Sequence, residues 1–119
     1  MIGPAPESIR LRKDKKTLSI KFQGKPEFEL TAEFLRVESP SAEVQGHNPS
    51  EKKIISGRKH VAIMEIEPVG NYAIRLIFDD LHDTGIYSWS YLFQLGRDHG
   101  QIWNNYLEEL EKRGLSRDP

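Results

Sequence analysis

The chain has 119 residues, 37% of them hydrophobic and 29% charged, and its 17 basic and 18 acidic side chains leave a net charge of −1. This balance fits one globular domain and lacks the basic excess of a nucleic-acid-binding protein, while the absence of cysteine excludes disulfides, thiolate nucleophiles and thiolate metal ligands. With no signal-peptide core and no apolar run near the ~20 residues that cross a bilayer, we expect a cytoplasmic protein without a membrane partner.

The first half of the chain predicts a small sheet built from hairpins. Apolar and polar residues alternate over 9–12 and 18–22, which is typical of strands with one buried face, and the polar residues 13–16 predict the turn between them. A third short strand is expected around Phe28 and Leu30, after a break that contains glycine and proline.

A short helix is expected to follow the third strand. Thr31 is a suitable N-cap for a helix over 32–37, and the residue before Pro40 should end it because that position is forced out of helical geometry. The polar stretch 41–57 is predicted to be a mobile loop.

The second half opens with the strongest strand signal. The run 61–66 is apolar on both faces for most of its length, which is typical of a central strand. A turn at 68–71 leads to a second alternating strand over 72–78, and a polar turn over 79–85 precedes a short extended piece at 86–87.

Two helical segments are predicted to close the chain. Ser88 or Ser90 could cap the first, Gly100 should separate the two, and Gly114 should end the second. Apolar residues at helical spacing support both segments: Tyr91, Leu92 and Leu95 in the first, and Ile102, Trp103, Tyr106, Leu107 and Leu110 in the second.

Separate blocks of strands and helices predict an α+β fold. We expect a small, mainly antiparallel sheet with one short helix after the third strand and two C-terminal helical segments packed on it. The expected single domain covers 6–113, with flexible ends at 1–5 and 114–119.

The turn 79–83 is the densest group of possible metal ligands. Asp80, His82 and Asp83 could hold a divalent ion through carboxylates and an imidazole. Asp-rich turns also form for local reasons, because Asp bonds its own backbone, and the plain turn is the preferred interpretation. We therefore predict no metal and no cofactor.

No catalytic constellation stands out, and we predict that the chain is not an enzyme. Ser39 and Ser41 lie near Glu38 and Glu43, but no histidine is placed in the sequence to activate a hydroxyl, and nothing resembles a nucleophile elbow.

Two features suggest a surface for a protein partner. The basic stretch 10–16, with Arg10 and Arg12, could touch an acidic partner, although a solvated hairpin is the preferred interpretation. The late aromatic residues cannot all share one helix face, so one or two rings should reach the surface. The candidate partner surface is Tyr87, Trp89, Tyr91, Arg10 and Arg12, on a monomer or weak dimer.

Three stretches carry a resemblance to a known family. Residues 34–44 (FLRVESPSAEV), 67–73 (EPVGNYA) and 82–89 (HDTGIYSW) resemble the gamma-butyrobetaine hydroxylase-like N-terminal domain family, over about Pro6 to Leu110. The family includes free-standing bacterial proteins, and it also occurs joined to the 2-oxoglutarate-dependent dioxygenases of carnitine biosynthesis and to ATP-binding iron–sulfur carrier proteins.

The resemblance also implies a metal position. In the carnitine enzymes this domain binds a structural zinc through three cysteines and a histidine, whose positions correspond here to Ser39, Ser41, Val44 and His82. Serine and valine cannot replace thiolates at zinc, so we expect the zinc site to be lost and its loop to be held by packing or hydrogen bonds.

The function implied by the resemblance is that of a helper domain. The iron and 2-oxoglutarate of the carnitine enzymes belong to a separate catalytic domain, so oxygenase activity is not carried over. The leading hypothesis is a non-catalytic interaction or adaptor domain, accessory to iron–sulfur cluster assembly or to a metabolic enzyme complex, with an unidentified protein partner. The alternative is a small-molecule or divalent-metal-binding protein that uses the Asp80/His82/Asp83 turn.

Overall fold

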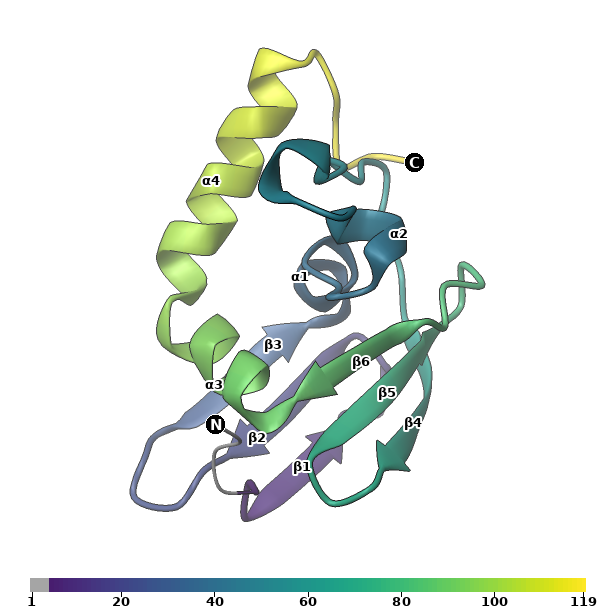
Figure 1. Cartoon of the computed structure of the whole chain (residues 1–119). Coiled ribbons are helices and arrows are strands. Elements are labelled where there is room, and N and C mark those ends of the chain that lie inside the picture. The colour runs from purple at the N-terminus through teal and green to yellow at the C-terminus, as the bar shows by residue number, and fades with distance from the viewer. Residues whose placement is uncertain (1–4) are drawn as a thin grey trace.

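A computed structural model describes residues 5–119 and shows two three-stranded antiparallel sheets with helices gathered at one end of both (Figure 1). The predicted α+β class is confirmed, although the strands divide into two sheets. The first sheet has the order β1 (Ser8–Leu11), β2 (Thr17–Lys21), β3 (Glu27–Thr31); the second has the order β4 (Ile63–Val69), β5 (Ala73–Phe78), β6 (Gly85–Ser88). The helices are α1 (Ala32–Val37), α2 (Ala42–Gln45), η1 (Pro49–Glu51), α3 (Trp89–Arg97) and α4 (His99–Lys112).

The apolar faces of the two sheets meet in one core. Leu18 and Ile20 of β2, and Leu76 and Phe78 of β5, are all at most 1% exposed and belong to the same cluster. Each pair is two residues apart, so the alternation in the sequence places both members on the inner face of a strand. A backbone hydrogen bond also joins the turn between β1 and β2 to the start of β4, where the amide of Ile63 donates to the carbonyl of Lys15 at 2.8 Å.

The predicted central strand is an edge strand, which corrects one expectation. The central strand of the second sheet is β5, whereas β4 pairs on one side only and exposes 46% of Met64. Pro68, predicted to lie in the turn, lies within β4, which an edge strand tolerates because its outer side needs no amide donor. The turn follows at Gly70, whose φ of +54° favours glycine.

Helix α1 begins and ends as predicted. The Thr31 hydroxyl accepts a hydrogen bond from the Phe34 amide at 3.1 Å, and the helix ends at Val37, shortly before Pro40. All six helical residues are buried, because α1 lies beneath the other helices and against the sheets (Figure 1). The centre of the domain is therefore a short helix with no solvent-facing side.

The stretch 41–57, predicted to be a loop, contains two short helices. Ser41 caps α2 by accepting from the Glu43 amide at 3.2 Å, and Asn48 caps η1 by accepting from the Ser50 amide at 3.1 Å. Serine and asparagine are preferred N-caps, so the signal was present in the sequence. We predicted a loop because the stretch is polar. Polar composition is typical of loops, but it is equally typical of helices of one turn.

The C-terminal helices follow the prediction with one correction. Ser88 caps α3 by accepting from the Tyr91 amide at 3.2 Å, and Gly114 has a φ of +64°, as a C-terminal stop requires. Gly100 does not separate the helices, because the break is at Asp98 and Gly100 lies inside the first turn of α4. Within residues 5–119, no helix has the length and apolar character to cross a bilayer.

The C-terminal segment, expected to be flexible, is held by specific contacts. The amides of Gly57 and Lys59 donate to the carbonyls of Ser116 and Arg117 at 2.9 and 3.0 Å. Arg117 also forms two hydrogen bonds, of 2.7 and 2.8 Å, with the carboxylate of Glu33 in α1. The chain after α4 therefore returns across the helical end of the domain (Figure 1). Most of the predicted flexible end 1–5 lies outside the described residues.

Candidate functional site

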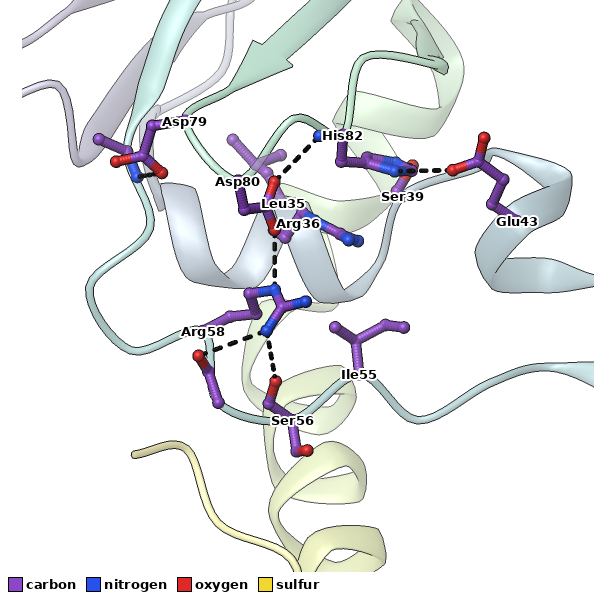
Figure 2. A network of polar contacts seen from close by, with 12 residues as sticks. Leu35, Arg36, Ser39, Glu43, Ile55, Ser56, Arg58, Asp79, Asp80 and His82 are labelled. Atoms are coloured by element: carbon purple, nitrogen blue, oxygen red, sulfur yellow. Dashed lines mark hydrogen bonds and ion pairs between the residues drawn. The ribbon is translucent and has the colours of Figure 1, made fainter. Parts of the chain in front are cut away.

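The segment between α1 and α2 and the turn after β5 meet at a buried histidine. His82 is 5% exposed, and its Nε2 lies 2.9 Å from Oγ of Ser39, which is 0% exposed (Figure 2). On the other side of the ring, Nδ1 lies 3.2 Å from a carboxylate oxygen of Glu43. With the proton on Nδ1 directed at Glu43, Nε2 is an acceptor and the Ser39 hydroxyl donates to it. We call Ser39, His82 and Glu43 the serine–histidine network.

The backbone leaves no spare room around this network. A Cβ placed on Gly85 would lie 2.6 Å from Ser39 Oγ and 3.0 Å from the ring of Tyr87, so β6 can pass here only with glycine at that position. A second bond, between the hydroxyls of Ser41 and Thr84 at 2.7 Å, joins the same two segments. Hydrogen bonds between side chains 43 residues apart therefore fasten the start of α2 to the turn before β6.

The order serine, histidine, carboxylate is that of a hydrolase triad, and the expectation that no histidine lies near Ser39 was wrong. A triad serine must reach a substrate carbonyl, and it needs donors aimed at the developing oxyanion. Ser39 is fully buried beneath Gly85 and Tyr87, so its hydroxyl cannot meet a substrate in this conformation. The geometry supports a structural role for the network.

Asp80 is the centre of a second group of contacts, beside the first (Figure 2). Its Oδ2 accepts from Nε of Arg36 at 2.8 Å and from Nε of Arg58 at 2.7 Å, and its Oδ1 accepts from the His82 amide at 3.1 Å. Burial alone would raise the pKa of Asp80, but the bonds from Arg36 and the amide outweigh it and lower the pKa. Asp80 therefore joins α1, the segment before β4 and the turn after β5.

The three metal candidates do not converge. Asp80 is taken up by two arginines and His82 by Ser39 and Glu43, while Asp83 lies 3.8 Å from a guanidinium nitrogen of Arg75 at the surface. Within residues 5–119, no three histidine, cysteine, aspartate or glutamate side chains are grouped so that they could hold a metal ion.

Some residues of the predicted partner surface are buried and others are exposed. Tyr87 is 0% exposed and bonds to the Leu35 carbonyl, and Trp89 is 8% exposed, so the expectation of exposed rings does not hold for these two. Tyr91 is half-buried and donates to the Glu38 carbonyl at 2.5 Å. Arg10 lies exposed on β1, and Arg12 lies exposed directly after that strand and is paired with Glu29.

A pocket lies between the β2–β3 hairpin and α3, and we call it the aromatic pocket. Its volume is about 370 Å³, and its lining includes Phe22, Trp89 and Phe93. The rings of Phe22 and Phe93 meet edge to face with centroids 5.5 Å apart. From the sequence, Trp89 was placed on a candidate partner surface, but this residue was not paired with the β2–β3 hairpin.

A larger cleft of about 510 Å³ separates α3 and α4 from the chain around η1. The hydroxyls of Tyr91 and Tyr106 that line it already donate to backbone carbonyls, at 2.5 and 2.7 Å. At its edge Glu38 forms an ion pair with Lys52 at 2.9 Å, and burial raises the pKa of Glu38. The two tyrosine hydroxyls and the Glu38 carboxylate of this cleft therefore already have hydrogen-bond or ion-pair partners within the chain.

Comparisons with known proteins give a consistent assignment. A family model described as gamma-butyrobetaine hydroxylase-like, N-terminal, matches residues 9–93. Two proteins with NMR solution structures are 47% and 43% identical, with TM-scores of 0.83 and 0.82; the matches cover 97% and 98% of this chain and 90% and 87% of theirs. A crystal structure of a protein of unknown function from Acidithiobacillus ferrooxidans, assigned to the DUF971 family, is 36% identical with a TM-score of 0.64, covering 76% of this chain and 91% of its own. No curated protein matches the chain.

The four residues that the family resemblance places at a zinc position do not fit that metal here. Ser39 and His82 bond to each other, Ser41 bonds to Thr84, and Val44 is 1% exposed and has no donor atom in its side chain. A structural zinc site needs four donors, usually thiolates and imidazoles, and only the imidazole is present. Hydrogen bonds join the segments at this position.

We expect metal removal to leave the stability unchanged. Treatment with a chelator, or addition of zinc at up to millimolar concentration, should shift the melting temperature by less than about 1 °C, because His82 is the only zinc donor among these four residues. Differential scanning calorimetry measures this, and NMR resonances of His82 should stay in place during the titration. A rise of several degrees with zinc would show that His82 belongs to a metal site.

The His82 ring predicts a fall in stability on acidification. Burial, and then the positive charge of Arg36, lower its pKa below the ordinary value of 6.5, so the unfolded chain takes up the proton first. The contribution of His82 to the free energy of unfolding should therefore be fully present above pH 6.5 and be lost as the pH falls through the folded-state pKa. Urea titrations between about pH 7.5 and 5 should show a smaller fall for His82→Gln.

The difference in the free energy of unfolding between wild type and His82→Gln, taken at each pH, isolates the contribution of His82. The raised pKa of Glu38 works in the opposite direction, because its contribution is present below pH 4.5 and is lost as the pH rises. Glu38 is present in both proteins, so its contribution cancels. Equal slopes for wild type and His82→Gln would contradict the assignment to His82.

Proposed function

Because the chain belongs to the gamma-butyrobetaine hydroxylase-like N-terminal domain family, we propose that it is a non-catalytic interaction domain. Its partner is another protein, and the aromatic pocket is the surface that receives it. The proposal extends to an adaptor role in iron–sulfur cluster assembly or in a metabolic enzyme complex. The resemblance supports that role, because the family occurs joined to proteins of both kinds.

The observation that carries the proposal is the contrast between the two kinds of site. The side chains that could do chemistry, Ser39 and His82, are enclosed and bonded to one another. The aromatic pocket is open, and its floor presents aromatic rings that water solvates poorly. Buried aromatic anchors in such pockets supply most of the binding energy in protein complexes.

Site-specific cross-linking in cells tests the proposal. A photoreactive amino acid at Ser90, which is exposed and lines the pocket, should give a reproducible adduct with one protein. The matched control is the same amino acid at Glu108, an exposed position on α4 away from the pocket. Equal adducts at both positions, or none at Ser90, would overturn the proposal.

A further inference from the structure

The floor of the aromatic pocket is rigid and apolar. Phe22 and Phe93 line the floor with their ring centroids 5.5 Å apart, and Phe28, which does not line the pocket, packs against both rings at 6.3 and 5.8 Å. Gly96 permits this packing, because a Cβ there would lie 2.3 Å from the ring of Phe28. Trp89 closes one side, held by a bond of 2.9 Å from its indole nitrogen to the Asn71 carbonyl. The floor is therefore formed before any ligand arrives.

The rim of the pocket is positively charged. Lys25 and Arg97 both lie over Phe93, with 5.9 and 5.8 Å between the charged group and the ring centroid. Asp98 pairs with Arg97 at 2.9 Å and offsets its charge. No ion pair within residues 5–119 includes Lys25, and residues 1–4 contain no carboxylate side chain. Lys25 therefore brings a positive charge that the described chain does not neutralise.

We propose that the aromatic pocket binds an acidic peptide segment of a partner protein that carries one large apolar side chain. The apolar side chain occupies the aromatic floor, and a neighbouring carboxylate pairs with Lys25. The inference rests on the proposed function and specifies the chemistry of its ligand. The pocket and such a segment are complementary: the apolar side chain removes the aromatic floor from water, and the carboxylate compensates the charge of the ammonium group.

The dimensions favour a peptide over the other ligands of this charge. A volume of about 370 Å³ is at the small end of ligand pockets and suits one or two side chains. Single-stranded nucleic acid also stacks on aromatic rings, but it needs a basic groove along its backbone, and the chain has a net charge of −1. The single uncompensated lysine matches one carboxylate beside the apolar side chain of a peptide.

Binding of short capped peptides to the full chain, followed by NMR, tests the inference. A peptide with a Leu-Phe centre flanked by aspartates should shift the indole resonance of Trp89 and the amide of Ser90, and leave Trp103 unmoved. A peptide with the same centre and lysine flanks, and one with aspartate flanks and a Ser-Ser centre, should bind at least about fivefold more weakly. A higher salt concentration should weaken the binding of the acidic peptide.

Charge reversal on the rim supplies a matched pair of variants. Lys25→Glu should weaken the binding of the acidic peptide by about fivefold or more. Lys13→Glu, the same change in the exposed β1–β2 turn, should leave the affinity within about twofold of the wild type. Equal loss in both variants, equal binding of the basic peptide, or displacement by a single-stranded oligonucleotide would overturn the ligand class. A Ser90 adduct without acidic-peptide binding would overturn this inference alone, and a missing adduct would overturn the function.

Discussion

Replacement of Asp80 by alanine should lower the free energy of unfolding by about 3 kcal/mol. The carboxylate joins Arg36 and Arg58, and the side chain of Arg36 is only 9% exposed. Its Nη1 has no partner among the described residues, so without Asp80 the guanidinium would be a buried charge with almost no compensation. Chemical denaturation followed by circular dichroism measures the loss.

A neighbouring aspartate is the control for this change. Asp83 lies in the same turn, but it is 55% exposed and 3.8 Å from Arg75, so Asp83→Ala should cost less than about 0.5 kcal/mol. Arg36→Met in the Asp80→Ala background should recover part of the loss, because it removes the unpaired charge. Equal effects of the two aspartate variants would contradict the role of Asp80 as the centre of its group.

Arg117→Ala should lower the free energy of unfolding by about 2 kcal/mol, although the residue lies near the end of the chain. It leaves the carboxylate of Glu33, which is 6% exposed, without its two charged hydrogen bonds. The guanidinium also lies 5.3 Å from the centroid of Trp103, so the change removes a contact with α4 as well. Thermal or urea denaturation measures the loss.

Hydrogen exchange separates this effect from a general loss of stability. In Arg117→Ala the amides of Gly57 and Lys59 should exchange faster than their neighbours, because they donate to the released segment. The control is Arg113→Ala, whose pair with Glu109 at 3.4 Å is exposed, with an expected cost below about 0.5 kcal/mol. Unchanged exchange in Arg117→Ala would show that the segment is not held by this side chain.

The α+β class and most element positions could be predicted from the sequence, because their causes are local. Strand periodicity, the Thr31 and Ser88 caps and the stop at Gly114 depend on residues within one turn of each other. The prediction that 61–66 forms a central strand was wrong, because an apolar run does not reveal whether a strand has one neighbour or two. That depends on which other strand reaches it.

The candidate site was less predictable, since its members are distant in the sequence. Asp80 and His82 were identified by type, but as metal ligands, because the sequence does not show that Arg36 and Ser39 lie beside them. Trp89 was proposed as part of a partner surface, yet the pocket that it lines also depends on Phe22 and Lys25 from the β2–β3 hairpin. Residue type indicates which contacts are possible, and the fold selects among them.

The periodic strands, the helix caps, the absence of thiolate ligands and the family resemblance follow from the order of the residues alone. The bond of Ser39 to His82, the contact of Arg117 with Glu33 and the position of Lys25 over Phe93 appear only in the folded chain. The difference arises from separation along the chain. A cap is fixed by atoms three residues away, whereas contacts between segments 43 to 84 residues apart exist only once the shared core has placed those segments together.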